Sequence, residues 1–374
     1  APEKIDWTVE TAQKGGHPHF MRKEIFEQPE AIENSLRGRI VAERGLAKLG
    51  GLEENEETLR KARRIFITAC GTSYFAGCVG KYMLEEYAGI PTEIDIASEL
   101  RYRKPLFQEG DMMLVISQSG ETADTLGALR EAKEKGVFTM SIVNTVGSTI
   151  ARETDAGIYQ HVGPEIGVAS TKAFTSQVAI LALLALFLGR ERQMSLTMGK
   201  RIAEELEKIP ALVRTAFQED EHIKELAKQY ARFNNFLYLG RKYNFPVAME
   251  GALKLKEISY VHAEGCGAGE MKHGPIAMID KNFPSVFLAP SDSVYEKILS
   301  NMQEVKARGG PVIAVATAGN REIAQIADHV LYIPKTLEML TPILAVIPLQ
   351  LFAYHMGVLR GHDVDKPRNL AKSV

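Results

Sequence analysis

The stretch LVISQSGETADT, residues 114–125, joins an apolar run to a turn rich in hydroxyl groups. The run from Met112 to Ile116 predicts a buried strand, and apolar residues at helical spacing predict a helix that begins near Ala123. A strand that leads through a turn into a helix N-terminus presents outward backbone N–H groups and the positive end of the helix dipole, which favours an anion. The turn also supplies side-chain donors from Ser117, Gln118, Ser119 and Thr122.

This turn has two interpretations. The simpler one is a Ser/Thr helix cap with no ligand. Three hydroxyl groups and a glutamine within six residues favour an anion site instead. No Walker lysine follows the turn, which argues against a nucleoside triphosphate, so a phosphomonoester is the anion that we expect.

Strands and helices alternate along the rest of the chain, and the pattern occurs twice. The alternation predicts parallel sheets covered on both faces by helices, and the repeat predicts two copies of one unit. The fold class is therefore α/β, with two tandem three-layer αβα domains and flavodoxin-like, mostly parallel doubly wound sheets. The strands are expected at 63–70, 91–97, 111–117, 137–144 and 156–162, and again at 234–240, 285–290, 310–317 and 329–334.

Domain boundaries follow from breaks in this alternation. The lead looks like an arm with two helices, and Pro29 is expected in the first turn of the second. Between the copies the chain is charged and helical, with an end expected near Pro210. The expected units are a linker (1–39), a first domain (40–192), a connector (193–221), a second domain (222–360) and a tail (361–374).

Composition excludes several classes of function. The chain has 374 residues and a net charge of −2 without a basic block, so we expect no nucleic-acid partner. The longest apolar run, Val178–Leu188, is about one core helix, so no membrane span is expected. Three cysteines, too few for a complete disulfide set, indicate a reducing compartment, hence the cytoplasm, and the chain has no metal-ligand spacing, so no metal site is expected.

Three charged residues of the second domain share one helix face. Glu250, Lys254 and Glu257 stand at i, i+4 and i+7 on a helix expected at 246–261. A solvated row of salt bridges would explain them. The helix is otherwise small and apolar, and it begins directly after a strand. These features make a Glu–Lys pair for proton transfer in a cleft an equally good interpretation.

Three further segments carry possible site residues. The glycine run at 265–269 follows a helix rather than a strand, so it fails as a dinucleotide motif and is expected to be a flexible loop carrying His273. This histidine is either an acid/base or a surface residue. The stretch from Gly167 to Lys172 looks like a helix cap or a binder of sugar hydroxyls. The polar tail would ordinarily be frayed.

Six motifs taken together resemble one known family, the glutamine:fructose-6-phosphate amidotransferases or glucosamine-6-phosphate synthases, in their isomerase part. The resemblance covers nearly the whole chain after Phe20, and the last three motifs narrow it from phosphosugar isomerase domains in general to the synthases. The motifs are ACGTSY (69–74), SQSGETADT (117–125), EIGVASTKAFT (165–175), EGALKLKEISY (250–260), KHGP (272–275) and DKPRNLAKSV (365–374).

The resemblance implies roles for matching positions. Glu257 would move a proton between C1 and C2, Lys254 would assist it, and Lys372 would form a Schiff base with the C2 carbonyl of fructose 6-phosphate. His273 would open the sugar ring from a neighbouring subunit, which implies a homodimer. The implied phosphate ligands are Ser117, Gln118, Ser119, Thr122 and Ser73, and the implied sugar contacts are Thr72, Val168 and Ser170.

The chain departs from the family at its start, which is Ala1-Pro2 with no cysteine before Cys70. We therefore expect it to lack the glutaminase domain and to be a fragment of a synthase. Alone it would interconvert fructose 6-phosphate and glucose 6-phosphate, and with ammonia it would yield glucosamine 6-phosphate. The alternatives are a sugar-phosphate-sensing regulatory module without catalysis, or a deglycase or other sugar-phosphate isomerase, against which the Lys372 motif argues.

Overall fold

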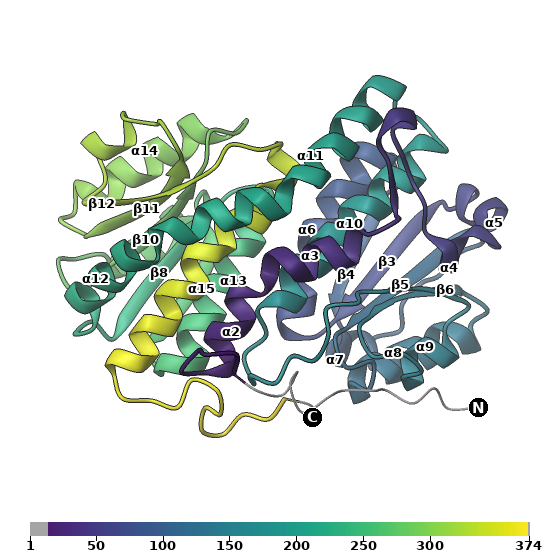
Figure 1. Cartoon of the computed structure of the whole chain (residues 1–374), viewed down its shortest axis with the longest axis horizontal. Helices are drawn as coiled ribbons and strands as arrows, with labels where there is room; N and C mark the ends of the chain where they lie inside the picture. Colours follow the sequence, from purple (N-terminus) through teal and green to yellow (C-terminus); the bar gives the residue numbers. More distant parts are fainter. Residues whose placement is uncertain (1–13, 373–374) are drawn as a thin grey trace.

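The structure is a computed structural model that describes residues 14–372, so the first part of the predicted linker and the last two residues of the tail lie outside it. Two α/β domains lie side by side and are joined by helices that cross between them (Figure 1). A short antiparallel pair, β1 (Ile40–Val41) and β2 (Leu46–Ala47), precedes the first domain.

Each domain is built on a five-stranded parallel sheet. The first has the order β4-β3-β5-β6-β7 and the second β12-β11-β10-β8-β9, which is the same order when each sheet is counted from its own first strand. This confirms the tandem, doubly wound, flavodoxin-like prediction. The strands are β3 (Arg64–Ala69), β4 (Thr92–Ile96), β5 (Asp111–Ser117), β6 (Phe138–Val143), β7 (Ala156–Tyr159), β8 (Asn235–Gly240), β9 (His262–Gly267), β10 (Ser285–Ala289), β11 (Val312–Thr317) and β12 (His329–Ile333).

Helices cover both faces of both sheets, and the inner layers meet in one core. Alternate residues of β5 point to opposite sides, so Leu114 joins the central cluster while Met113 packs against the outer helices. The inner helices are α6 (Gly71–Met83), α10 (Lys172–Arg190), α13 (Asn244–Ser259) and α15 (Thr341–Leu359). The outer ones are α7 (Ala97–Leu100), α8 (Ala123–Glu134) and α9 (Thr149–Glu153) on the first sheet, and α14 (Tyr295–Lys306) on the second.

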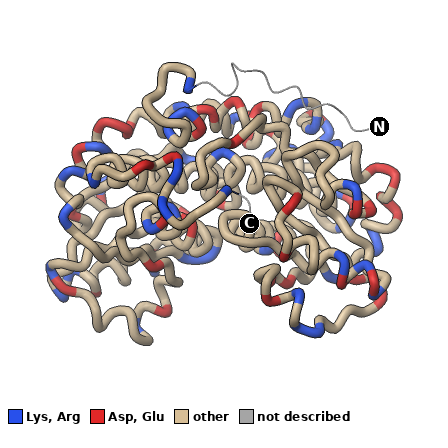
Figure 2. The backbone as a smooth tube through the Cα atoms, turned by 90° about the horizontal axis from the view of Figure 1, so that it is seen from below, with Lys and Arg blue, Asp and Glu red and all other residues tan. Residues whose placement is uncertain are grey.

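The most apolar helices lie inside the protein. α10 and the segment Glu338–Leu359 are long and apolar enough to cross a membrane, but 100% and 89% of their most apolar windows are buried here. They are therefore core helices that are apolar on all sides. Positions of Lys and Arg are interspersed with positions of Asp and Glu along the backbone of both domains (Figure 2).

The lead and the connector are helical and pack across the domains. The lead forms α2 (Phe20–Phe26) and α3 (Gln28–Leu36), with Pro29 in the first turn of α3 as predicted. The connector forms α11 (Leu196–Ala216) and α12 (Asp220–Tyr230). The expected end near Pro210 was wrong, because buried contacts of α11 outweigh the local cost of a proline inside the helix. Two short helices, α4 (Gly50–Glu53) and α5 (Glu56–Arg60), precede β3.

The glycine run was also misassigned. His262–Gly267 is not a flexible loop but the edge strand β9, which pairs with β8 and is followed by two short 3₁₀ turns. A Cβ on Gly265 would lie 2.4 Å from the Cα of Met249, so glycine here permits close packing of α13 on the sheet. The prediction of a flexible loop was wrong because Gly265 is needed for close packing and not for flexibility.

Candidate active site

The hydroxyl-rich turn at the end of β5 is folded by its own hydrogen bonds. The Ser117 hydroxyl accepts the N–H of Gly120 at 3.0 Å and lies 3.0 Å from the Thr122 hydroxyl. Gly120 has φ +68°, and a Cβ there would lie 2.0 Å from the Ser148 hydroxyl, so only glycine fits. Thr122 occupies the N-cap position of α8 but makes no side-chain capping bond. This turn, which we call the cradle, is therefore shaped by its own hydrogen bonds, and the Thr122 side chain does not cap α8.

The charged face of α13 is buried rather than solvated. Lys254 and Glu250 have fully buried side chains, and Glu257 is 20% exposed. The amine of Lys254 lies 2.7 Å from a carboxylate oxygen of Glu257 and 3.5 Å from one of Glu250. It also donates to the hydroxyl of Thr72 at 3.0 Å, and that hydroxyl donates to Glu250 at 3.2 Å. The network thus connects the start of α6 in the first domain to α13 in the second.

The buried network has shifted proton affinities. Burial raises the pKa of Glu250 to about 8, more than the attraction of Lys254 lowers it. Burial lowers the pKa of Lys254, but its attraction to Glu250 and Glu257 outweighs burial and raises it overall. Lys254 is therefore a fixed positive charge that presents a proton beside Glu257.

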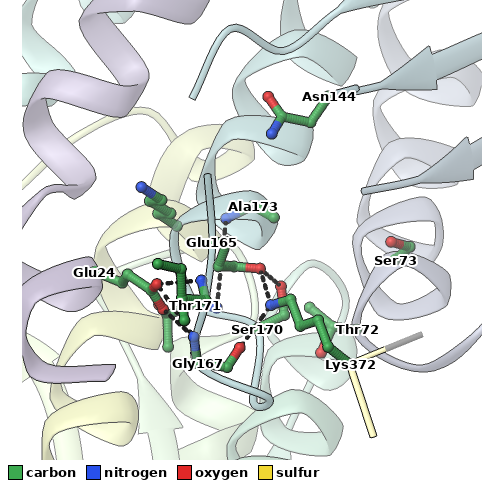
Figure 3. Close-up of polar contacts among 12 residues, drawn as sticks. Glu24, Thr72, Ser73, Asn144, Glu165, Gly167, Ser170, Thr171, Ala173 and Lys372 are labelled. Atoms are coloured by element: carbon green, nitrogen blue, oxygen red, sulfur yellow. Dashed lines mark hydrogen bonds and ion pairs between the residues drawn. The ribbon is translucent and has the colours of Figure 1, made fainter. Parts of the chain in front are cut away.

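Within the described residues, the C-terminal tail reaches a defined contact at Lys372. The amine of Lys372 lies 2.7 Å from a carboxylate oxygen of Glu165 and 2.7 Å from the carbonyl oxygen of Gly167. Figure 3 shows Lys372 pointing toward Glu165 and Ser170. The Ser170 hydroxyl donates to the same Glu165 oxygen at 2.8 Å. The loop that precedes α10 thus holds the lysine.

Glu165 is the anchor of this contact. Its other oxygen accepts the backbone N–H groups of Thr171 at 2.8 Å and Ala173 at 3.2 Å, at the N-terminus of α10. Burial opposes its charge, but attraction to Lys372 and these hydrogen bonds hold its pKa at about 2. Glu165 therefore stays a carboxylate near neutral pH.

One cavity of about 340 Å³ gathers these parts, and ten of the twelve predicted site residues line it. Its walls come from the ends of β3 and β5, the loop before α10, α13 and the tail, so both domains contribute. In open parallel sheets this strand end is where ligands bind. The ten residues are Thr72, Ser73, Ser117, Gln118, Ser119, Thr122, Val168, Ser170, Glu257 and Lys372.

The remaining two predicted residues lie outside the lining. Lys254 lies directly behind Glu257, to which it is bonded. His273 is exposed in a 3₁₀ turn and does not line the cavity of its own chain. Ser73 is held by a hydrogen bond from Gln177 at 3.0 Å.

Sequence reasoning missed Glu165, which also lines the cavity. A single acidic residue at the start of the otherwise small and hydroxyl-bearing stretch EIGVAST was the available signal. The other lining residues without a predicted role are Cys70, Gly71, Ile116 and Ala371.

Comparisons with known proteins agree with this architecture. A family model for the SIS domain matches residues 58–187 and 229–360. The chain is 54% identical over 371 residues to the glutamine–fructose-6-phosphate aminotransferase [isomerizing] of Chlorobaculum tepidum, covering 99% of this chain and 60% of the relative. It is 52% identical over 373 residues to the enzyme of the same name from Bacteroides thetaiotaomicron, covering 100% of this chain and 61% of the relative.

A solved structure matches over its whole length. The C-terminal domain of glucosamine-fructose-6-phosphate aminotransferase from Francisella tularensis superposes with a TM-score of 0.91 at 42% identity, covering 95% of this chain and 99% of that one. The chain therefore spans about three fifths of the length of its curated relatives and nearly all of this C-terminal domain.

Proposed function

We propose a function from the premise that this chain belongs to the SIS domain family, alongside the C-terminal domains of the glucosamine–fructose-6-phosphate aminotransferases. The chain is the isomerase part of such an enzyme. Alone it interconverts fructose 6-phosphate and glucose 6-phosphate, and with ammonia it forms glucosamine 6-phosphate. The observation that carries this proposal is the single cavity that joins the hydroxyl-rich cradle, Glu257 and Lys372.

Phosphate binding would orient the substrate. The cradle at 117–122 offers hydroxyl and backbone donors at the N-terminus of α8, and Ser73 faces it from α6. These donors suit a doubly charged phosphomonoester without a lysine. Holding the phosphate at one end places the other end of an open-chain sugar toward the second domain, which turns binding energy into proximity.

The reacting end of the sugar would meet two groups. The amine of Lys372, after it has lost a proton to water, attacks the C2 carbonyl and water leaves, so that an imine forms. Ammonia displaces the lysine from this imine, and Glu257 then moves a proton from C1 to C2, so that C1 becomes the aldehyde and C2 keeps the amino group. Without ammonia, water returns the imine to the ketone, and Glu257 moves the proton through a cis-enediol while the ammonium of Lys372 polarises the C2 oxygen, which yields the C1 aldehyde and C2 hydroxyl of glucose 6-phosphate. Lys254 holds Glu257 at 2.7 Å and balances its charge as the proton moves. Sugar hydroxyls would contact Thr72, Ser170 and the backbone of Val168, and no cofactor or metal takes part.

The complete enzyme would contain further parts. A glutaminase domain would supply ammonia, in keeping with the fraction of the relatives that this chain spans. His273 would act on the ring oxygen of a substrate in the neighbouring subunit of a homodimer. Its exposure, and its position outside the cavity of its own chain, support that arrangement. The enzyme would work in the cytoplasm.

The test is a coupled assay for glucose 6-phosphate formed from fructose 6-phosphate. Lys372→Ala and Glu257→Ala should each lose most turnover, and the former should also abolish imine trapping by borohydride. Lys366→Ala is the matched control, because Lys366 lies on the same tail but is exposed. Tight binding of fructose 6-phosphate without turnover by the unchanged chain would favour the sensor and contradict the enzyme proposal.

A further inference from the structure

The lead helix α2 reaches the active-site loop through one buried acidic residue. Glu24 is 2% exposed, and its carboxylate accepts the backbone N–H groups of Ile166 and Gly167. Figure 3 shows Glu24 on one side of this loop and Lys372 on the other. Glu24 thus binds the residues that directly follow Glu165.

Gly167 is the shared element of the two contacts. Its N–H is bound by Glu24 at 3.2 Å, and its carbonyl oxygen is bound by Lys372 at 2.7 Å. A Cβ at this position would lie 2.9 Å from a carboxylate oxygen of Glu24, so a side chain would push the loop away from α2. The glycine therefore permits a close approach of the carboxylate to the loop backbone.

The helix that carries Glu24 is itself fixed against the tail. The carboxylate of Asp365 accepts the N–H groups of Phe20 at 2.9 Å and Met21 at 2.8 Å, at the start of α2. The carbonyl oxygen of Asp365 accepts the N–H of Val168 at 3.0 Å. Lead, loop and tail therefore form a closed ring of contacts. Asp365 contacts the start of α2 directly, and Lys372 is linked to α2 through Gly167 and Glu24.

We propose that Glu24 is a positioning residue for Lys372, which holds the loop at Ile166 and Gly167 so that the amine is presented to the substrate carbonyl. This inference rests on the proposed role of Lys372. It assigns to the lead a part in the reaction besides its place in the chain between domains. A displaced loop would move both acceptors of the amine at once, and errors of this kind are costly for a nucleophile.

The electrostatics of Glu24 make this contact sensitive to protonation. Burial and the nearby carboxylate of Glu165 raise its pKa to about 7, against the backbone hydrogen bond and the attraction of Lys372 and Lys172. The charged neighbours of Glu24 are Glu165 on the loop, Lys372 on the tail and Lys172 on α10. When Glu24 takes up a proton, it loses part of its hold on the loop, so turnover should fall on the acid side of neutral pH.

The experiment compares Glu24→Gln with a control variant of the same lead in the whole chain. The amide of the first variant replaces one acceptor oxygen by a donor that faces the N–H of Gly167. Glu30→Gln is the matched control, because Glu30 belongs to the same lead but is exposed, whereas Glu27 pairs with the buried Lys172 at 2.8 Å, a neighbour of Glu24. The first measurement needs no turnover: acetic anhydride labels Lys372, and mass spectrometry gives the rate. The second measures kcat and KM for fructose 6-phosphate between pH 6 and 8, with borohydride trapping of the imine.

We expect Glu24→Gln to label several-fold faster at Lys372 and to lose roughly ten- to hundredfold in kcat with an unchanged KM. Its kcat should also vary less with pH, and Glu30→Gln should match the parent. Glu24→Asp keeps the charge, should lie between the two, and replaces Glu24→Gln if that variant does not fold. Unchanged labelling, or a rise in KM alone, would overturn the role of Glu24. An inactive parent with faster labelling in Glu24→Gln would instead count against the proposed function and leave the positioning role standing.

Discussion

The amine of Lys372 lies 2.7 Å from the carboxylate of Glu165, across a separation of 207 residues in the chain. This ion pair holds Lys372 at the cavity, beside the residues that the sugar would contact. Because Glu165 is buried and also caps the N-terminus of α10, the position of the lysine is tied to the core of the first domain.

Replacing Glu165 by glutamine should release Lys372. The amide keeps the shape of the side chain but cannot pair with an ammonium, so we expect roughly a ten- to hundredfold loss of kcat. The folded-state pKa of about 2, against an ordinary value of 4.5, implies stability that is present above pH 4.5 and lost as the pH falls toward 2, about 3 kcal/mol in all. Urea midpoints between pH 2 and 6 measure this loss, which should be smaller in the variant. An equal loss of stability in acid for the parent and the Glu165→Gln variant would contradict the lowered pKa of Glu165.

Glu250 should affect stability in the opposite pH direction. Its folded-state pKa of about 8 lies above the ordinary value of 4.5, so its contribution is fully present below pH 4.5 and lost as the pH rises through 8. The parent should therefore lose up to about 1.4 kcal/mol per pH unit between pH 6 and 8. Glu250→Gln should lose less, because the amide mimics the neutral acid. Thermal unfolding at each pH gives the comparison, with the exposed Glu225→Gln as the control; a slope retained in Glu250→Gln would argue against a neutral carboxyl group.

Removing Lys254 should cost both stability and turnover. Lys254→Met leaves Glu250 and Glu257 without their buried cation, which is expected to destabilise the fold by about 3–5 kcal/mol. Lys228→Met is the control, because its pair with Glu225 is exposed to solvent and is expected to add little stability. Calorimetry and the isomerase assay measure the two effects. Similar melting temperatures for the two variants would show that the buried pair adds no net stability.

The strand β9 offers a test of the fold itself. Gly265→Ala should lower the melting temperature, because the new Cβ would lie 2.4 Å from the Cα of Met249 on α13. Gly267→Ala, in the same strand, meets only a flexible side chain at 3.9 Å and should be tolerated. A loop of high mobility at these residues would accept both substitutions equally, so the difference between the two melting temperatures decides the point.

Much of the fold could be read from local pattern. Apolar or alternating runs bounded by turns predicted nine of the ten sheet strands, and central strands such as β5 are apolar throughout because they are buried on both faces. The exception, β9, is rich in glycine and polar residues, and a helix packs closely against it. Gly265 is required by its close contact with Met249 on the preceding helix α13, and that contact depends on how the helix packs on the sheet, which no local pattern records. The same limitation applies to Pro210, whose place inside α11 is set by tertiary packing.

The sequence by itself determined the cradle at 117–122 and the shared helix face of Glu250, Lys254 and Glu257, because each depends on spacing within a single element. Only the tertiary structure decided that these two elements face one cavity and that Glu250 and Lys254 are buried. It also decided that Glu165 and Glu24 hold the loop beside Lys372. The reason is physical: hydrogen bonds between residues more than a hundred positions apart depend on how sheets, helices and tail pack, and that packing is set by the core as a whole.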